Sequence, residues 1–283
     1  MGSPRCSVVI PTYNRSAVLA YAIRSVLAQT MEEFELLVVG DGCDDDSEDL
    51  VSGCADSRVH WLNLPVNTGH QSGPNNAALR RAASPFVAYL GHDDLWLPGH
   101  LEAIMPALEK GAAFVHSSVA ICSPGRSLRR LDKPPWWRIR GRRKPWIPPT
   151  CFAHPVAPAI RLGGWPGPDA CGRVDPEAQL AWALTRGGGR RVHIPRLTAV
   201  KLPAAHRENC YLDANALEQA AWWALISHAQ DSEASVAEAV RLNRPPVAPK
   251  ANATKMPGPI LSTPKRHQVR RRYKGLPPVS GAD

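Results

Sequence analysis

Short apolar runs alternate with stretches of helical periodicity over the first 120 residues, and this alternation constrains the fold more than any other feature of the sequence. Each run has about five residues rich in Val, Ile and Leu, which is typical of a buried strand. Such alternation predicts an α/β fold: a mainly parallel sheet flanked by helices, which binds ligands at the carboxyl ends of its strands. The predicted strands are Cys6–Ile10, Glu35–Val39, Arg58–Leu62, Pro85–Leu90 and Ala112–Ser118.

Helices are predicted between and after these strands, where apolar residues recur at helical spacing. Ser16 is placed to cap the first helix, and Pro98 falls in the first turn of another, where its missing N–H costs nothing. A further strand is expected near Pro155–Ile160. The other predicted elements are helices at 18–27, Asn75–Ala83, Pro98–Lys110, Pro176–Arg186, Asn215–Gln230 and Glu233–Asn243, and strands at Arg190–Ile194 and Leu197–Lys201.

Positive charge is concentrated in two Pro-rich stretches, residues 123–150 and 244–283. Each has a net charge of +8 against +9 for the whole chain, so the remainder is mildly acidic. Such a stretch is either merely solvated, which we favour for the second, or attracts phosphates, nucleic acid or an anionic membrane surface. Nucleic acid is the least favoured partner, because neither stretch has a recognition-helix pattern. Trp136, Trp137 and Trp146 lie in the first stretch and suit stacking on a sugar, a membrane interface or a lid.

The cysteines and the apolar runs predict the cellular location. Seven cysteines include no CxxC pair, which argues against a disulfide framework or a thiolate zinc site and fits a reducing compartment. No signal peptide pattern opens the sequence, and no apolar run approaches the ~18 residues of a membrane-spanning helix. We therefore expect a cytoplasmic protein, with peripheral contact to the inner face of an anionic membrane through the basic stretches.

Polar clusters follow three of the predicted strands. The first strand ends in Pro11-Thr12-Tyr13-Asn14-Arg15, which suits an anionic, ring-bearing ligand or, equally, a turn that caps the next helix. The second ends in a segment, 40–47, that is rich in Gly and Asp. There Asp41 can accept hydrogen bonds from a base or ribose, whereas Asp44–Asp46 and Ser47 suit capping and solvation.

The fourth predicted strand ends in Gly91-His92-Asp93-Asp94. Two adjacent carboxylates at a strand end repel each other unless a cation or hydrogen-bond donors compensate them. Helix capping explains them poorly, because the next helix is expected only near Pro98. Oxygen ligands of this kind suit Mg²⁺ or Mn²⁺, which complete their coordination with substrate phosphates. This turn is therefore predicted to bind a metal ion.

In this order and spacing, the motifs resemble those of the family 2 inverting glycosyltransferases, which have the GT-A fold. The resemblance covers about three quarters of the chain, from Cys6 to Tyr211. It implies a metal-assisted enzyme that transfers a sugar, with inversion, from a nucleoside-diphosphate sugar donor to a hydroxyl acceptor such as a glycan, a lipid or a small molecule. The matching segments are SVVIPTYNR (7–15), LLVVGDG (36–42), NTGHQSGPNNAAL (67–79), AYLGHDDLWLP (88–98) and IPRLTAVKLP (194–203).

The resemblance also implies roles for individual residues. Asp93 matches the last Asp of the family's DxD metal-binding motif, and Asp94 follows it as in many members. Gly91 and Gly40 replace acids that the family usually has, and His92 or a water is expected to compensate at the first of these positions. The nucleotide-sugar site is predicted to contain Pro11, Thr12, Tyr13, Arg15, Asp41, Asn67, Gly69, Asn75, His92, Asp93 and Arg207, and the metal site Asp93, Asp94 and His206.

An inverting transfer needs a general base to deprotonate the acceptor hydroxyl. The family takes this base from an acidic motif that opens a helix in the second half, and the resemblance places Glu177 there, with Asp175 as the reserve candidate. The competing interpretation is ordinary helix capping, which suits Asp175 at the position before Pro176. Gln179 stands where the family usually has an acid. A plain surface turn is an equally good interpretation of His206 and Arg207.

The resemblance organises the chain into one domain and a tail. The domain is 1–243, and it consists of a nucleotide-sugar-binding half, a basic variable loop and an acceptor-side catalytic half that includes C-terminal helices. These parts are 1–120, 121–150 and 151–243. The tail, 244–283, is predicted to be disordered or loosely attached because Pro, Lys and Arg replace apolar periodicity there.

Two other functions remain open from the sequence alone. A catalytically weakened nucleotide-sugar-binding protein would account for Gly40, Gly91 and Gln179. A sugar-phosphate nucleotidyltransferase is less favoured, because it would need a Gly-rich basic loop after the first strand and PTYNR is not one.

Overall fold

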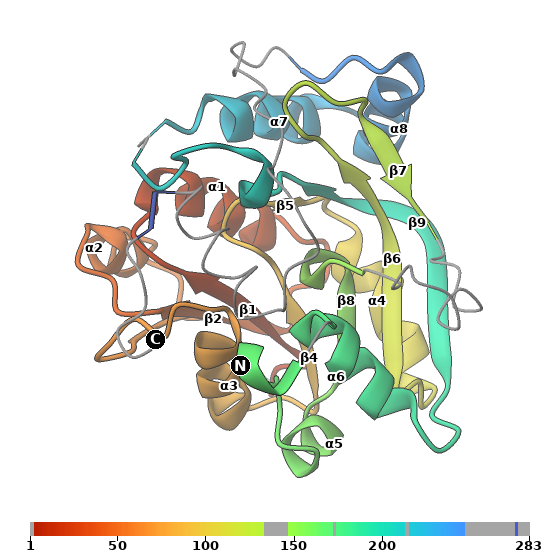
Figure 1. Cartoon of the computed structure of the whole chain (residues 1–283). Coiled ribbons are helices and arrows are strands. Elements are labelled where there is room, and N and C mark those ends of the chain that lie inside the picture. The colour runs from red at the N-terminus through yellow and green to blue at the C-terminus, as the bar shows by residue number, and fades with distance from the viewer. Residues whose placement is uncertain (1–2, 133–146, 172–173, 213–214, 247–274, 277–283) are drawn as a thin grey trace.

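Nine strands of the described chain form one sheet with helices packed on both of its faces (Figure 1). The computed structural model describes residues 3–132, 147–171, 174–212, 215–246 and 275–276. The strands are β1 (Cys6–Thr12), β2 (Phe34–Gly40), β3 (Val59–Asn63), β4 (Phe86–Tyr89), β5 (Leu95–Trp96), β6 (Phe114–Ile121), β7 (Arg129–Leu131), β8 (Phe152–Pro155) and β9 (Arg191–Lys201). The helices are α1 (Ser16–Leu27), α2 (Ser47–Ser52), α3 (Ser72–Arg81), α4 (His100–Glu109), α5 (Val156–Arg161), α6 (Pro176–Thr185), α7 (Leu217–His228) and α8 (Ser232–Leu242), with 3₁₀ turns at Pro149–Cys151, Pro168–Cys171 and Ala204–His206.

The strand order in the sheet is β3-β2-β1-β4-β8-β6-β9-β5, and β7 pairs with β6 beside this path. β1 is parallel to β2 and β4, β2 is parallel to β3, and β6 is parallel to β9. β8 runs antiparallel between β4 and β6, and β5 and β7 are also antiparallel to their partners. The predicted fold class, a mainly parallel GT-A sheet flanked by helices, is confirmed.

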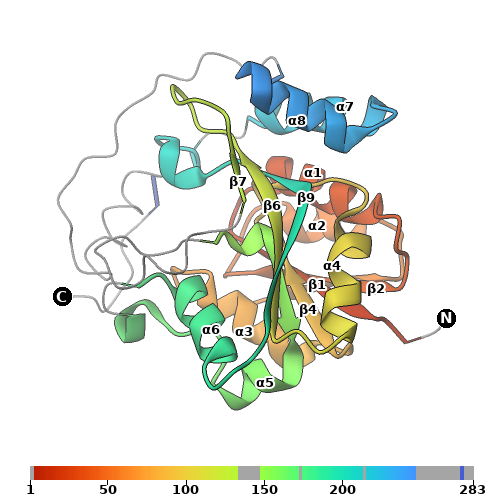
Figure 2. The ribbon, with the colours of Figure 1, turned by 90° about the vertical axis from the view of Figure 1, so that its right-hand side faces the viewer.

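The first four strands contain a topological switch point. From β1 the chain adds β2 and β3 on one side and then crosses to place β4 on the other side. Because connections between parallel strands are right-handed, reversing the direction of strand addition puts the connecting helices on opposite faces and opens a crevice at the carboxyl ends of β1 and β4. In Figure 2, α4 lies on one side of the sheet and α3, α5 and α6 lie on the other.

One predicted element is wrong in type. The segment predicted as a strand near Pro155–Ile160 is helix α5, and the strand β8 comes just before it. A short apolar run fits a buried strand and a buried helix equally well, so periodicity could not decide between them. Pro158 does not prevent the helix, because it lies in the first turn, where backbone N–H groups have no partner within the helix.

Two predicted strands prove to be one. β9 continues through Pro195 as an eleven-residue strand, and its register with β6 shifts between Ile194 and Leu197. A proline cannot donate to the neighbouring strand, so an irregularity there is the expected solution. The described ends of the predicted basic loop, 121–150, contain short elements: β7 and the start of the turn Pro149–Cys151.

The start of the first helix differs from the prediction. Ser16 is its first residue and makes no side-chain cap; instead the Asp45 carboxylate accepts a hydrogen bond from the Ser16 N–H at 3.2 Å and one from the Ser47 N–H at 3.1 Å. Asp46 occupies the N-cap position of α2 without a side-chain hydrogen bond. Pro98 precedes α4, which begins at His100. The acids after β2 therefore cap helices as expected, through Asp45.

The two basic stretches are described only in part. Trp136, Trp137 and Trp146 lie outside the described residues, as does most of the tail. Gly275 and Leu276 are described, and Leu276 lines the cleft discussed below. None of the helices in the described ranges combines the length and the apolar character that crossing a bilayer requires.

Candidate active site

A cleft of about 580 Å³ opens at the carboxyl ends of the central strands, over the switch point. It gathers residues from β1, from the segments after β2, β3 and β4, and from the second half of the chain. Of the predicted site residues, the cleft is lined by Pro11, Thr12, Tyr13, Asp41, Asn67, Gly69, His92, Asp93, Asp175, Glu177 and His206. Arg15, Asn75, Asp94 and Arg207 do not line it.

The two acids of the turn after β4 have different surroundings. Asp94 is completely buried, and its carboxylate accepts hydrogen bonds from Lys201 Nζ at 2.7 Å, from the Leu202 N–H at 2.8 Å and from the Thr150 hydroxyl. Burial opposes the charge of Lys201, but the Asp94 carboxylate outweighs this effect, and the pKa of Lys201 is raised. These contacts favour a structural role for Asp94 over the predicted metal-binding role.

Asp93 faces the cleft and is paired with Arg15. The Arg15 guanidinium donates a hydrogen bond to Asp93 Oδ1, and His92 Nε2 lies 3.4 Å from the same oxygen. Both side chains of the ion pair are almost buried, with 6% and 9% of their surfaces exposed. Arg15 is therefore brought to the site, as predicted, but its contact there is with the acid.

Tyr211, which also lines the cleft, contacts the side chains of Arg15 and His92. Its hydroxyl lies 3.3 Å from His92 Nε2, and its ring lies 5.3 Å from Arg15 Cζ, within the range of a cation–π contact. Its ring centroid is 6.3 Å from that of Tyr13. The Tyr211 side chain thus contacts three predicted site residues at the cleft.

Both glycines that replace family acids stand where a side chain has no room. A Cβ on Gly91 would lie 2.5 Å from Asp94 Oδ2, and a Cβ on Gly40 would lie 2.5 Å from Asn63 Oδ1. Asn63 uses its amide to bind both the N–H and the carbonyl of Cys43, so it fixes the turn after β2. In both cases, neighbouring polar groups occupy the space that a larger side chain would need.

Asp41 connects the end of β2 to the segment after β3. Its carboxylate accepts hydrogen bonds from the N–H and hydroxyl of Thr68, at 2.9 and 2.7 Å, and from the Gly69 N–H at 3.1 Å. Gly69 has φ +78°, a left-handed conformation that glycine adopts without strain. Asp41 therefore positions the segment that carries Asn67 and Gly69, two predicted nucleotide-sugar ligands, and it also lines the cleft itself.

Several predicted nucleotide ligands carry buried polar atoms without a hydrogen-bond partner among the described residues. These atoms are Thr12 Oγ1, Asn67 Oδ1 and both amide atoms of Asn75. Buried polar groups are almost always hydrogen-bonded in folded proteins, so each exception needs an explanation. Thr12 and Asn67 line the cleft, and Asn75 directly follows Pro74, which also lines it. Unmet hydrogen-bonding capacity at this cleft suits a polar ligand.

The start of α6 brings the two candidate bases to the cleft. Glu177 lies in the first turn, and Gln71 donates a hydrogen bond to its Oε2 at 3.1 Å. Asp175 holds the N-cap position, as the capping interpretation required, but makes no side-chain capping hydrogen bond. Gln179, which replaces a usual acid, donates to the Cys171 carbonyl at 2.9 Å, a contact that an acid could not make.

Of the last two predicted residues, His206 and Arg207, only His206 lines the cleft. His206 lines the cleft, and its Nδ1 lies 2.8 Å from Ser123 Oγ. The Arg207 guanidinium is instead bound to Glu218, with N–O distances of 2.5 and 2.8 Å, and to the Pro203 carbonyl. Arg207 thus fits a structural ion pair better than the predicted contact with phosphate.

The residues at the cleft fit one kind of metal site. Within the described ranges, no three His, Cys, Asp or Glu side chains are grouped to hold a metal ion. Asp93 nevertheless presents a carboxylate beside the cleft, next to the His92 imidazole. A cation such as Mg²⁺ or Mn²⁺ commonly takes one or two carboxylates and completes its coordination with phosphate oxygens and water. The donor set fits that arrangement and not a site formed by protein ligands alone.

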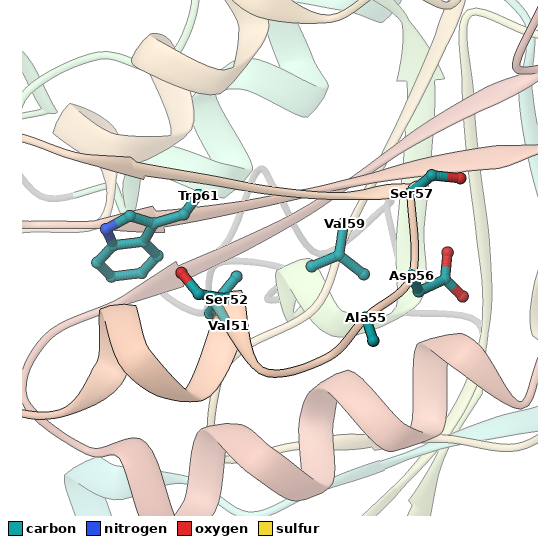
Figure 3. Close-up of a pocket in the computed structure, with 7 residues that line it drawn as sticks. All are labelled: Val51, Ser52, Ala55, Asp56, Ser57, Val59 and Trp61. Carbon is teal, nitrogen blue, oxygen red and sulfur yellow. The ribbon is translucent and has the colours of Figure 1, made fainter.

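A second hollow, of about 320 Å³, lies between α2 and β3 (Figure 3). Trp61 lies at one end of it, and Asp56 and Ser57 lie at the other. Its only acid, Asp56, is bound by the Arg58 guanidinium at 2.8 Å. The hollow is formed largely by the segment that precedes β3, away from the carboxyl ends of the strands, and it brings together no catalytic constellation.

Several cleft residues were not assigned from the sequence. Lys201 and Gln71 were inside the quoted motifs but had no role, and Tyr211 marked only the end of the resemblance. Arg126 and Arg129 were counted in the basic stretch without a position. Each reaches the cleft through the tertiary fold, since they come from β9, from the segment before α3, from the hairpin after β6 and, for Tyr211, from the segment after the turn Ala204–His206.

The mainly parallel sheet with a cleft over its switch point is a fold of the GT-A class. Within that class, the chain belongs to glycosyl transferase family 2, because the sequence model of this family matches residues 7–160, more than half of the chain. The match covers β1 to β8, including the strand ends that carry Thr12, Asp41 and Asp93. It ends before α6, so Glu177 and Asp175 lie beyond it.

Two curated relatives each match slightly less than half of the chain. One is the GalNAc(5)-diNAcBac-PP-undecaprenol beta-1,3-glucosyltransferase of Campylobacter jejuni, 32% identical over 46% of this chain and 42% of that protein. Another is the UDP-Glc:alpha-D-GlcNAc-diphosphoundecaprenol beta-1,3-glucosyltransferase WfgD of Escherichia coli, 36% identical over 45% of this chain and 51% of that protein. The matches thus span about half the length of these relatives.

Solved structures share the fold. The S. aureus TarS 1-349 complex with UDP-GlcNAc superposes with a TM-score of 0.59 at 17% identity, covering 83% of this chain and 70% of that one. The mannosyltransferase PcManGT from Pyrobaculum calidifontis, in complex with GDP-Man and Mn²⁺, gives a TM-score of 0.55 at 18% identity, covering 85% and 65%. At these identities the likeness extends to the fold alone.

Proposed function

We propose that this protein transfers a sugar, with inversion, from a nucleoside-diphosphate sugar to a hydroxyl acceptor. The observation that carries the proposal is that Asp93 and Glu177, which come from opposite halves of the chain, line the same cleft over the switch point. Membership of glycosyl transferase family 2 supports the reaction class. The unsatisfied polar atoms of Thr12, Asn67 and Asn75 support a polar ligand such as a nucleotide on the β1 side.

In this proposal Glu177 is the general base. Its carboxylate would accept the proton of the acceptor hydroxyl while that oxygen attacks the anomeric carbon. The Gln71 amide donates to one of its oxygens at 3.1 Å, so the carboxylate is oriented by one donor while it lines the cleft. Asp175 remains the second candidate, since it also lines the cleft and is not used as a side-chain cap.

Asp93 would hold the divalent cation, Mg²⁺ or Mn²⁺. When bound, such an ion neutralises the charge that develops on a leaving diphosphate. The Arg15 guanidinium, already bound to Asp93, holds this carboxylate in position at the cleft wall and adds positive charge beside it. We keep Asp93 as the metal ligand, with His206 as an additional candidate, and assign Asp94 to the support of the turn.

The acceptor is expected to enter from the side of α6 and the β6–β7 hairpin. Two curated relatives are named for acceptors linked to diphosphoundecaprenol. Their names support the proposed location, in which a cytoplasmic protein meets its acceptor at the inner face of a membrane. The basic stretches would supply the peripheral contact with anionic lipid.

A catalytically weakened nucleotide-sugar-binding protein is the second candidate. The observation that favours it is the Arg15–Asp93 ion pair, since a guanidinium already compensates the one carboxylate assigned to the metal. A binder of this kind would retain the nucleotide ligands at the β1 side and would not cleave the donor.

A binding screen followed by donor hydrolysis tests the proposal. Nucleoside diphosphates are screened by thermal shift with Mn²⁺ and Mg²⁺, because a ligand that binds only the folded state raises the melting temperature. Donor sugars of the nucleotide that binds are then assayed for release of nucleoside diphosphate. Asp93→Asn is expected to lower this release by about 10²-fold or more, while Asp46→Asn, an exposed acid after β2, serves as the matched control.

Each outcome has a definite meaning. Release by the wild type and by Asp46→Asn, with loss in a folded Asp93→Asn, supports the enzyme. Binding without any release supports the weakened binder instead. Wild-type release by Asp93→Asn would remove Asp93 from the proposed site.

A further inference from the structure

The cationic side chains around the cleft divide into two groups. Arg15, Lys201 and Arg207 are paired with Asp93, Asp94 and Glu218, respectively, so carboxylates of the protein already compensate their charges. Arg126 and Arg129 line the cleft as exposed side chains, and no side-chain hydrogen bond or ion pair joins them to another described residue.

The hairpin that carries these two arginines is anchored at several points. Leu128, between them, is buried in the apolar cluster under α7 and α8, and its N–H donates to Asn243 Oδ1 at 2.7 Å. Ser123, at the start of the turn, lies 2.8 Å from His206 Nδ1 at the cleft wall. The two guanidiniums therefore extend from a backbone that is held in place, which lowers the entropy lost when they bind an anion.

Successive side chains of β7 point to opposite faces, so Arg129 and its neighbour Arg130 have different surroundings. Arg129 lines the cleft, whereas the adjacent Arg130 binds Asp132 at 2.6 Å and the Pro195 carbonyl at 2.9 Å. Successive side chains of a strand point to opposite faces, so one arginine meets the cleft and its neighbour meets the protein. Arg126 joins Arg129 at the cleft from the turn before β7.

The position of the hairpin separates it from the proposed donor side. In the sheet order, β4 and β8 lie between β1, which carries Pro11 and Thr12, and β6, which carries the hairpin. The donor would be held at β1, β2 and the turn after β4. An anion bound by Arg126 and Arg129 would then belong to the other substrate.

We propose that Arg126 and Arg129 bind a phosphate group of the acceptor. This inference rests on the proposed function, since it names the class of acceptor. A guanidinium binds phosphate oxygens in a bidentate manner, and two of them match the charge of a phosphate or diphosphate. The acceptor would thus be a molecule that carries its hydroxyl and a phosphate together, such as a sugar linked to a lipid diphosphate.

Calorimetric titration of the cleft in two stages tests this inference. The full-length protein is first titrated with the nucleoside diphosphate that binds in the thermal-shift screen, and then, when saturated, with geranyl diphosphate, inorganic pyrophosphate or geraniol. The double variant Arg126→Ala/Arg129→Ala is compared with Arg80→Ala/Arg81→Ala. The latter removes two exposed arginines at the end of α3, outside the cleft, with the same change in net charge.

The wild type is expected to bind geranyl diphosphate in the saturated state more weakly as salt rises, and geraniol is expected not to bind. Arg126→Ala/Arg129→Ala should weaken geranyl diphosphate binding by about tenfold or more and leave nucleoside diphosphate affinity within about twofold. The Arg80/Arg81 control should match the wild type in both stages. Equal binding of pyrophosphate would show that phosphate alone is recognised, without a contribution from the lipid.

Three results would overturn the inference. Unchanged geranyl diphosphate binding in the double variant would mean that the two arginines are solvated surface residues with no role in binding. A loss confined to nucleoside diphosphate affinity would assign them to the donor. Wild-type protein that binds a nucleoside diphosphate but no second phosphate compound would refute the acceptor site and leave the proposed function standing, whereas failure to bind any nucleoside diphosphate would refute the proposed function itself.

Discussion

The two walls of the cleft satisfy their charges in different ways. On the wall formed by the ends of β1, β2 and β4, protein groups bind every carboxylate discussed above: Thr68 and Gly69 bind Asp41, Arg15 binds Asp93, and Lys201 binds Asp94. The wall formed by α6 and the β6–β7 hairpin presents Arg126 and Arg129, which lack such partners among the described residues. The charges of the first wall are thus paired within the protein, whereas the second wall presents positive charge that a ligand can compensate.

This difference teaches where substrate specificity should reside. A wall with internally paired charges changes little when a ligand binds, so it suits a component that many related proteins share, such as a nucleotide. A wall with uncompensated charge selects its partner by electrostatics. The family match, which covers 7–160, contains the ends of β1, β2 and β4 and also the β6–β7 hairpin, and it stops before α6.

On the wall formed by the ends of β1, β2 and β4, removal of the Asp94 carboxylate should cause the largest loss of folding stability. Asp94→Ala leaves the largely buried Lys201 ammonium without its carboxylate, and we expect the free energy of unfolding to fall by about 3–5 kcal/mol. Urea denaturation measures this effect. The double variant Asp94→Ala/Lys201→Met, which removes both charges, should recover part of the loss. No recovery would mean that the ion pair does not explain the burial of Asp94.

Substitution of the candidate bases tests the chemistry of the second wall. Glu177→Gln should lower the rate of sugar transfer by about 10²- to 10⁴-fold, because it removes the proton acceptor while preserving shape. Nucleoside diphosphate affinity, measured by calorimetry, should stay unchanged, since Glu177 belongs to the wall opposite the nucleotide. Asp175→Asn is the matched control. If it causes the larger loss, Asp175 and not Glu177 is the base.

A methyl group at Gly91 tests how tightly the turn after β4 is packed. Gly91→Ala places a Cβ 2.5 Å from Asp94 Oδ2, so the Asp94–Lys201 pair must shift, and we expect a loss of stability of about 1–3 kcal/mol. Gly167→Ala is the control, because a Cβ there would meet no atom within 4 Å. Equal melting temperatures for the two variants would show that the turn has room for a family-like side chain.

Two buried histidines, His100 in α4 and His154 in β8, should make stability depend on pH. Burial lowers the pKa of His100 to about 3 and that of His154 to about 4. Because the unfolded chain binds these protons near pH 6.5 and the folded protein does not, stability is complete above pH 6.5 and falls as the pH decreases below it. At pH 5.5, one pH unit below the unfolded pKa, the loss should be about 1.4 kcal/mol for each histidine. His100→Gln should reduce the slope of unfolding free energy against pH, and an unchanged slope would contradict the assignment.

The sequence predicted the elements with strong periodicity and the polar strand ends. β1, β2, β6, α6 and α8 lie at or near their predicted bounds, and the Asp93 turn does face the cleft at the carboxyl end of β4. These successes follow from local signals, because strand length, helical spacing and the position of Gly and Asp are all properties of neighbouring residues.

Features that depend on distant contacts could not be predicted in this way. Asp94 and Asp93 are equivalent in the sequence pattern, and only Lys201, Leu202 and Thr150, which lie far along the chain, determine that Asp94 is buried. Arg207 fits a phosphate ligand and a plain surface turn equally well in the sequence, and its ion pair with Glu218 depends on where α7 packs. The packing around Gly91 likewise requires knowledge of which groups fill the space beside it.

The pairing of Lys201 with Asp94 also bears on how the chain reaches its folded state. The two residues are 107 positions apart, and β8 and β9, from the second half, are inserted into the sheet beside strands of the first. A fragment of residues 1–120 would lack the cation that compensates a carboxylate at the end of its own β4. We therefore expect that this half cannot be excised as an autonomous nucleotide-binding module, and that the cleft forms only in the final, long-range stage of folding.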